Sequence, residues 1–145
     1  MIKFITKLFS TKGNNKQSIN SGDMITELSD GENLVDGKHT FEDAEKEKDN
    51  IDYMKKCCDA ELKKMKKSGF VASPFYFKRV AILSRKEKNY KQEVEYCEKY
   101  ISSVEKFYEE NGTGGIADVR KGSSYKNIVK RYPKAKALLE NHGSN

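Results

Sequence analysis

The side chains best suited to catalysis in this sequence are few and far apart. Its two histidines are His39, in a polar stretch, and His142, near the C-terminus. Nucleophilic catalysis needs a cysteine or serine beside a positioned base, and no such context surrounds any of the three cysteines, Cys57, Cys58 and Cys97. Structural zinc sites use paired ligands a few residues apart, which an adjacent pair and one remote cysteine do not supply. We therefore expect a chain that is not an enzyme and that has no catalytic residue, no metal and no cofactor.

A glycine-rich run at residues 111–123, NGTGGIADVRKGS, superficially resembles a phosphate-binding loop. It lacks the order of glycine, four residues, glycine, lysine and serine that such loops need, and no strand pattern precedes it. We interpret this run as a plain loop.

Carboxylates are plentiful on the charged stretches, where lysines one turn away normally pair with them at the surface. Glu93 is the exception, since it lies one turn before Cys97, which faces the expected core. We interpret Glu93 as a partly buried residue that forms a salt bridge.

Charge gives the strongest functional signal outside the apolar pattern. Between Val119 and Leu139 the chain has no acid and the following basic residues: Arg120, Lys121, Lys126, Lys130, Arg131, Lys134 and Lys136. Tyr125 and Tyr132 lie among them and either stack on bases or belong to the core. Such a patch can hold phosphates with salt-sensitive affinity. A solubilising lysine face and a surface for an acidic protein are the alternatives.

The composition fits one small domain. The 145 residues are 36% hydrophobic and 34% charged, so the core must be modest. The net charge of +6 favours nucleic acid, an anionic membrane or an acidic protein as partner. An odd number of cysteines is a poor disulfide framework, so we expect reduced thiols in a reducing compartment. Neither a signal peptide nor a run of ~20 apolar residues is evident, and we expect a cytoplasmic protein.

The chain divides at about residue 40. We predict a flexible segment over residues 1–40 and a helical domain over residues 41–145. Residues 1–9, MIKFITKLF, form a short amphipathic pattern. This segment either makes weak contact with a membrane surface or docks on a partner, or it packs on its own domain or frays. Thr40 is predicted to cap a first helix that ends at Gly69, and a homodimer through this long helix is a further alternative.

Three more helices are expected, with no strand pattern anywhere. They run from Pro74 to a break at Lys88-Asn89, from Tyr90 to about Glu110, and over residues 124–141, the last broken or kinked at Pro133. The helix from Tyr90 has an apolar stripe that needs a partner helix to cover it. The stripe residues are Tyr90, Val94, Cys97, Ile101, Val104 and Tyr108. This pattern predicts a packed helical hairpin.

Residues 74–101 resemble a single tetratricopeptide-type repeat. The residues that match its spacing are Phe77, Val80 and Ala81 on the first helix and Tyr90, Val94, Cys97, Tyr100 and Ile101 on the second. Glu93 stands where the family has a small residue, and no second copy follows. The resemblance implies a hairpin that binds peptides or proteins in a groove.

Together these features predict an all-α fold, a compact bundle of four or five helices containing one tetratricopeptide-like helix-turn-helix hairpin. The expected function is a protein-interaction module, an adaptor or inhibitor, that binds an acidic or nucleoprotein partner through a basic helical surface. The residues expected to contact the partner are Lys78, Arg79, Arg85, Lys86, Arg120, Lys121, Lys126, Lys130, Arg131 and Lys134. The alternatives are a nucleic-acid-binding protein that uses the C-terminal basic patch, and a protein of a phage or mobile element that blocks a host complex.

Overall fold

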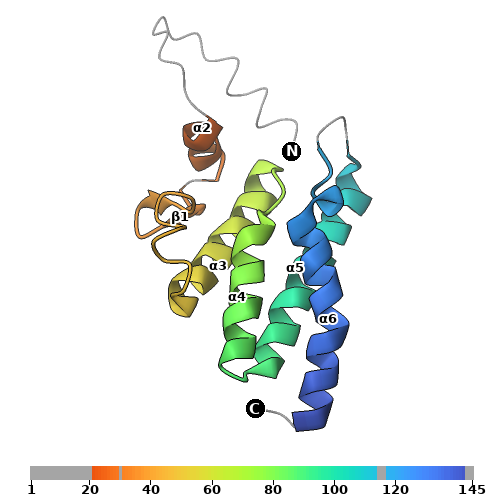
Figure 1. Ribbon diagram of the computed structural model, residues 1–145. Helices are drawn as coiled ribbons and strands as arrows, with labels where there is room; N and C mark the ends of the chain where they lie inside the picture. The colour runs from red at the N-terminus through yellow and green to blue at the C-terminus, as the bar shows by residue number, and fades with distance from the viewer. Residues whose placement is uncertain (1–20, 30, 114–116, 143–145) are drawn as a thin grey trace, which may run out of the picture.

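The structure is a bundle of α-helices, which confirms the all-α prediction (Figure 1). In this computed structural model, residues 21–29, 31–113 and 117–142 are described. The elements in chain order are α2 (Ser21–Leu28), β1 (Leu34–Val35), β2 (Lys38–His39), α3 (Ile51–Ser68), α4 (Pro74–Lys86), α5 (Tyr90–Asn111), the 3-10 helix η1 (Val119–Lys121) and α6 (Ser123–His142). The amphipathic pattern predicted for residues 1–9 lies outside the described residues.

Helix α4 is the centre of the bundle, because it packs against α3, α5 and α6. Helices α4 and α6 lie side by side on one face, with α5 behind them (Figure 1). Phe77, Val80 and Ala81 on α4 are each 0% exposed. The ring of Phe77 meets that of Tyr100 edge to face at 4.6 Å, a geometry that aromatic quadrupoles favour. Helix α4 is therefore contacted on more than one side.

The turn between α4 and α5 follows the local sequence. Pro74 occupies the first position of α4 after Ser73, where its missing N–H costs nothing. Lys88 has a φ of 59°, and this left-handed residue reverses the chain. Asn89 then caps α5, and its side chain accepts a hydrogen bond from the backbone N–H of Gln92 at 3.1 Å. The predicted break at Lys88-Asn89 is therefore confirmed.

The first long helix begins later than the sequence predicts. Thr40 is not its cap, because the Thr40 hydroxyl donates to Glu61 Oε1 at 2.9 Å and residues 41–49 form turns. Asn50 caps α3 instead, accepting from the N–H of Tyr53 at 3.2 Å. Phe41, which directly follows the predicted cap, is 65% exposed. The charged residues that follow Phe41 have no continuous apolar face to bury, so the helix begins only at Ile51.

The buried arc of α5 is wider than the predicted stripe. Tyr90, Cys97, Val104 and Tyr108 are buried as expected, whereas Val94 and Ile101 are only half-buried. The additional buried residues are Glu93, Tyr96 and Tyr100. Because α5 packs against both α4 and α6, its two neighbours cover an arc broader than a single-stripe pattern describes.

Helix α6 continues through Pro133, where the sequence predicts a break or kink. Proline has no N–H to donate to the carbonyl of Val129. Val129 is 43% exposed, so this turn of α6 lies at the surface of the bundle, where water can replace a lost backbone hydrogen bond.

Residues 21–40, expected to be part of a linker, contain α2 and a two-stranded ladder. Leu34 pairs with His39 and Val35 with Lys38 in antiparallel register. Asp36 and Gly37, with φ of 50° and 79°, form the connecting turn, which requires positive φ at both positions. Val35 is 4% exposed and belongs to the core, so this hairpin and α2 pack against α3.

Candidate functional site

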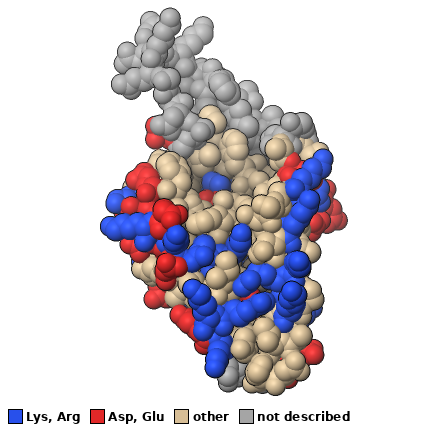
Figure 2. Space-filling view, viewed as in Figure 1, with Lys and Arg blue, Asp and Glu red and all other residues tan. Residues whose placement is uncertain are grey.

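The face formed by α4 and α6 is strongly basic. Helix α4 has four Lys or Arg residues and no acid, and α6 has five with Glu140 as its only acid. Helix α5, by contrast, has six glutamates and three lysines. Lys and Arg side chains cover much of the face over α4 and α6, and the acidic side chains in this view lie mainly near its edges (Figure 2). Charge is thus segregated between the helices of the bundle.

The lysines predicted to contact a partner are available on this face. Within the described part of the chain no ion pair engages any of Lys78, Lys86, Lys121, Lys126, Lys130 and Lys134. Lys126, Lys130 and Lys134 follow one another at intervals of four residues on α6 and are exposed, so they are about 6 Å apart along the helix axis. We refer to these three residues as the α6 lysine row.

Two of the four predicted arginines are held by internal acids at the surface. Arg79 Nη2 donates to Asp49 Oδ1 at 2.6 Å, and its Nε donates to the carbonyl of Lys48 at 2.9 Å. Arg120 pairs with Asp118 at 2.7 Å and with Glu105 at 3.1 Å, and its guanidinium lies 4.4 Å from the Tyr108 ring centroid. The hydrogen bond between the two side chains raises the pKa of Arg120, with the charges of Asp118 and Glu105 adding to the effect, and the hydrogen bonds from Arg120 lower the pKa of Asp118. The charges of these two arginines are therefore engaged within the protein.

Arg85 and Arg131 share a single buried carboxylate. Glu93 on α5 is 0% exposed. Arg85 Nε from α4 donates to its Oε1 at 2.9 Å, and Arg131 Nε from α6 lies 3.3 Å from its Oε2. This Arg85–Glu93–Arg131 cluster joins the three central helices. The sequence indicated a partly buried, salt-bridging Glu93, but not that two arginines from different helices meet on it.

Burial sets the protonation chemistry near this cluster. Desolvation lowers the pKa of Arg131, with the nearby Arg85 adding to the effect against the attraction of Glu93. Desolvation, reinforced by Glu93, raises the pKa of the Cys97 thiol to about 12. A thiol with such a pKa stays protonated at neutral pH and is a poor nucleophile. Cys97 is therefore part of the core packing and not a reactive group.

The sequence left open whether Tyr125 and Tyr132 stack on bases or belong to the core. In the structure both side chains make contacts within the protein. Tyr125 is 6% exposed, and its hydroxyl donates to Glu105 Oε1 at 2.8 Å. Tyr132 is half-buried, and Lys136 Nζ lies 4.3 Å from its ring centroid. In this arrangement neither ring offers a free face to a nucleic-acid base.

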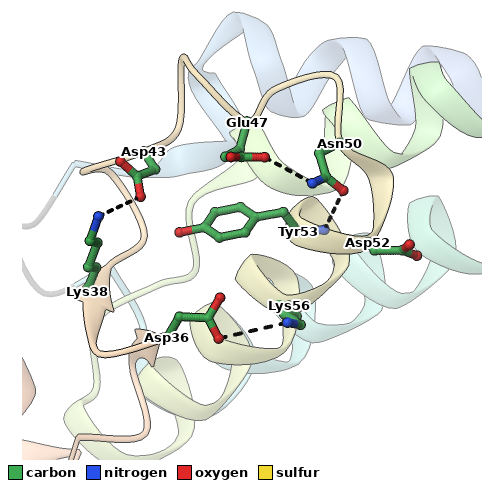
Figure 3. Close-up of a pocket in the computed structure, with 8 residues that line it drawn as sticks. All are labelled: Asp36, Lys38, Asp43, Glu47, Asn50, Asp52, Tyr53 and Lys56. Atoms are coloured by element: carbon green, nitrogen blue, oxygen red, sulfur yellow. Dashed lines mark hydrogen bonds and ion pairs between the residues drawn. The ribbon is translucent and has the colours of Figure 1, made fainter.

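A polar cavity of about 460 Å³ lies between the hairpin and the start of α3 (Figure 3). Four carboxylates line it, those of Asp36, Asp43, Glu47 and Asp52, together with Lys38, Asn50, Tyr53 and Lys56. Lys38 pairs with Asp43 at 3.1 Å and Lys56 with Asp36 at 3.8 Å. No cysteine, serine or histidine is among the lining residues. The cavity therefore lacks the cysteine or serine beside a histidine that one common form of nucleophilic catalysis uses.

The cysteines and the histidines of the chain lie in different environments in the structure. Within the described residues, no group of three or more His, Cys, Asp and Glu side chains is arranged to hold a metal ion. Cys57, Cys58 and Cys97 are buried and free. The ring of His39 stacks on that of Phe41 with 5.2 Å between the ring centroids, and the ring centroids of His142 and Tyr90 are 5.3 Å apart.

Glu61 is a second buried carboxylate, which the sequence gave no reason to single out. It is 4% exposed and accepts hydrogen bonds from the Thr40 hydroxyl and the Ser73 N–H, each at 2.9 Å. Lys64 Nζ lies 2.6 Å from it. Its position at the N-terminus of α4 places an anion where the helix dipole favours one. Lys64 lies three residues after Glu61, and such pairs are common on exposed helix faces. The sequence pattern alone therefore predicts that Glu61 lies at the surface.

No protein-family model matches the chain, and neither a search of curated proteins nor one of solved structures finds a match. Among the described helices, none has the length and apolar character needed to span a bilayer.

Proposed function

We propose that this chain is a non-enzymatic interaction module that binds the acidic surface of another protein through the face formed by α4 and α6. The observation that carries the proposal is the set of lysines on α4, η1 and α6 that have no internal ion pair in the described residues. Unpaired cations on one face create a positive potential that attracts an acidic partner and orients it.

The resemblance to a tetratricopeptide-type hairpin supports the choice of a protein as partner. Helices α4 and α5 pack as the expected hairpin, and α6 contacts both of them. In the family that this hairpin resembles, the helical surface holds peptides or proteins. The proposal places an adaptor or inhibitor in the cytoplasm, where the thiols of Cys57, Cys58 and Cys97 remain reduced.

The test is a comparison of three forms of the protein as bait in nuclease-treated cell lysate. The first is the wild type, and the second is Lys126→Glu/Lys130→Glu/Lys134→Glu, which reverses the α6 lysine row. The third is Lys63→Glu/Lys66→Glu/Lys91→Glu, a control with the same change in net charge at exposed positions on α3 and α5. We expect the wild type and the control to retain the same protein at low salt, and the α6 variant to lose it. Raising the salt should weaken this retention, since surface charges are screened.

A nucleic-acid-binding protein is the second candidate, and the α6 lysine row supports it because evenly spaced cations can contact successive phosphates. It predicts that retention of any partner disappears after nuclease treatment and that purified DNA or RNA binds with a steep salt dependence. Recovery of nucleic acid from untreated lysate, with no specific protein retained from the nuclease-treated lysate, would contradict the leading proposal. Co-purification with a host nucleoprotein assembly would instead favour a protein that blocks a host complex.

A further inference from the structure

We propose that Arg85 and Arg131 together form a binding site for one carboxylate group, supplied by an aspartate or glutamate side chain of the acidic partner. The inference rests on the proposed function, and it identifies where on the basic face a single acidic side chain is held.

The first argument is charge balance. Two guanidinium groups face one carboxylate, Glu93, so the cluster keeps a net positive charge. Within the described residues no second acid pairs with Arg85 or Arg131. Arg120, by comparison, has two acids, and Arg79 has one acid and a backbone carbonyl. Arg85 and Arg131 are therefore the arginines whose charge the fold compensates least.

The second argument is the number of donors. A guanidinium has five N–H groups, and Arg85 uses its Nε on Glu93. Arg85 Nη2 is buried and has no hydrogen-bond partner among the described residues, and the contact of Arg131 Nε with Glu93 lies outside hydrogen-bond geometry. Buried donors are normally satisfied. Glu93 Oε2 is also without a hydrogen-bond partner among the described residues, yet two guanidinium groups carry more N–H donors than one carboxylate accepts. An added carboxylate would supply two further oxygen acceptors to the donors that reach the surface.

The third argument is position. The side chains of Arg85 and Arg131 are 30% and 17% exposed, while that of Glu93 beneath them is 0% exposed. Both arginines therefore reach the surface where α4 and α6 meet, held from below by a fixed anion. A partly buried cation attracts an anion more strongly than a lysine in water does. The planar guanidinium also fits a carboxylate through two parallel hydrogen bonds.

A protein carboxylate fits the surroundings better than the phosphate of a nucleic acid. Single-stranded nucleic acid sites combine cations with exposed aromatic rings for stacking, and Tyr125 and Tyr132 are both occupied internally. Half-buried Ile82 lies three residues before Arg85 on α4, and half-buried Leu138 lies seven residues after Arg131 on α6. A surface that combines arginine with apolar side chains has the composition typical of protein interfaces.

The test uses the side-chain N–H signals of the four arginines in the NMR spectrum of the full-length protein, titrated with glutarate at constant ionic strength. We expect the signals of Arg85 and Arg131 to shift and saturate, and those of Arg79 and Arg120 to stay in place. Arg85→Lys and Arg131→Lys should each weaken glutarate binding about tenfold, because a lysine keeps the charge but loses the paired hydrogen bonds. Arg79→Lys is the matched control and should bind glutarate as the wild type does.

Three results would overturn the site: no saturable shift at Arg85 and Arg131, equal shifts at all four arginines, or a response to inorganic phosphate without one to glutarate. The wild-type titration decides the question even if a lysine variant folds poorly. Glutarate needs no partner protein, so its failure removes only this carboxylate site. The proposed function is removed instead if no specific protein is retained from nuclease-treated lysate and untreated lysate yields nucleic acid alone.

Discussion

Replacing Glu93 by alanine should destabilise the fold more than any exposed glutamate replacement on the same helix. The change leaves Arg85 and Arg131 close together without the anion that they share. Removing one partner of a fully buried ion pair costs about 3–5 kcal/mol. The arginine side chains are 30% and 17% exposed and can turn toward water, which reduces the penalty. We therefore expect a loss of about 3 kcal/mol in the free energy of unfolding.

The assay is urea unfolding followed by far-ultraviolet circular dichroism, with thermal melting as a second measurement. A loss of that size should lower Tm by roughly 6–12 °C in a chain of this length. Glu95→Ala is the matched control, since Glu95 is exposed two residues further along α5. It should change the free energy of unfolding by no more than about 0.5 kcal/mol.

A variant in which Leu replaces Glu93, Arg85 and Arg131 together separates the charge effect from a packing effect. Apolar replacement of a complete buried charge cluster is often neutral or stabilising, so this variant should regain most of the lost stability. If Glu93→Ala unfolds at the same urea concentration as Glu95→Ala, the view that Glu93 neutralises two arginines between three helices is incorrect.

Two further predictions concern the other buried groups. Glu61→Ala removes the acceptor of Thr40 and Ser73 and should lower the free energy of unfolding by about 2–4 kcal/mol in the same urea assay, and a loss no larger than that of Glu95→Ala would contradict this role. Burial also raises the pKa of the Cys57 and Cys97 thiols to about 12 from the ordinary value of 9.0. Above pH 9 the unfolded chain loses these protons while the native protein keeps them, so stability should be unaffected by these thiols below pH 9 and should fall as the pH rises toward 12. Urea midpoints measured between pH 8 and 11 test this, Cys97→Ala should show a shallower decline, and identical slopes for the variant and the wild type would argue against a contribution from Cys97.

Much of the helical framework was predictable because helix ends depend on neighbouring residues. Ser73 and Pro74 begin α4 as the sequence indicated. Gly69 ends α3 with a φ of 76° and donates its N–H to the carbonyl of Met65 at 3.2 Å, a conformation that glycine adopts without strain. Asn89 caps α5 by accepting a hydrogen bond from the N–H of Gln92, which is also an interaction between near neighbours in the chain.

The start of α3 was not predictable from the same rules. Thr40 followed by acidic residues resembles a helix start, and the rule for caps is local. The hydroxyl of Thr40 is instead used by Glu61, far along the chain, and Asn50 becomes the cap. Thr40 and Glu61 come together only when the chain has folded, so their hydrogen bond cannot be predicted from the residues next to Thr40.

The sequence by itself determined the helical class, most helix ends and the segregation of charge, since propensity, capping and composition act within a few residues. The tertiary structure alone decided which cations remain available. Lysines of the α6 row and arginines such as Arg120 look equivalent in the chain, yet the first are unpaired in the described residues and the second is held by Asp118 and Glu105. That difference depends on which helices meet, because an ion pair forms only where packing brings an acid within reach of a base.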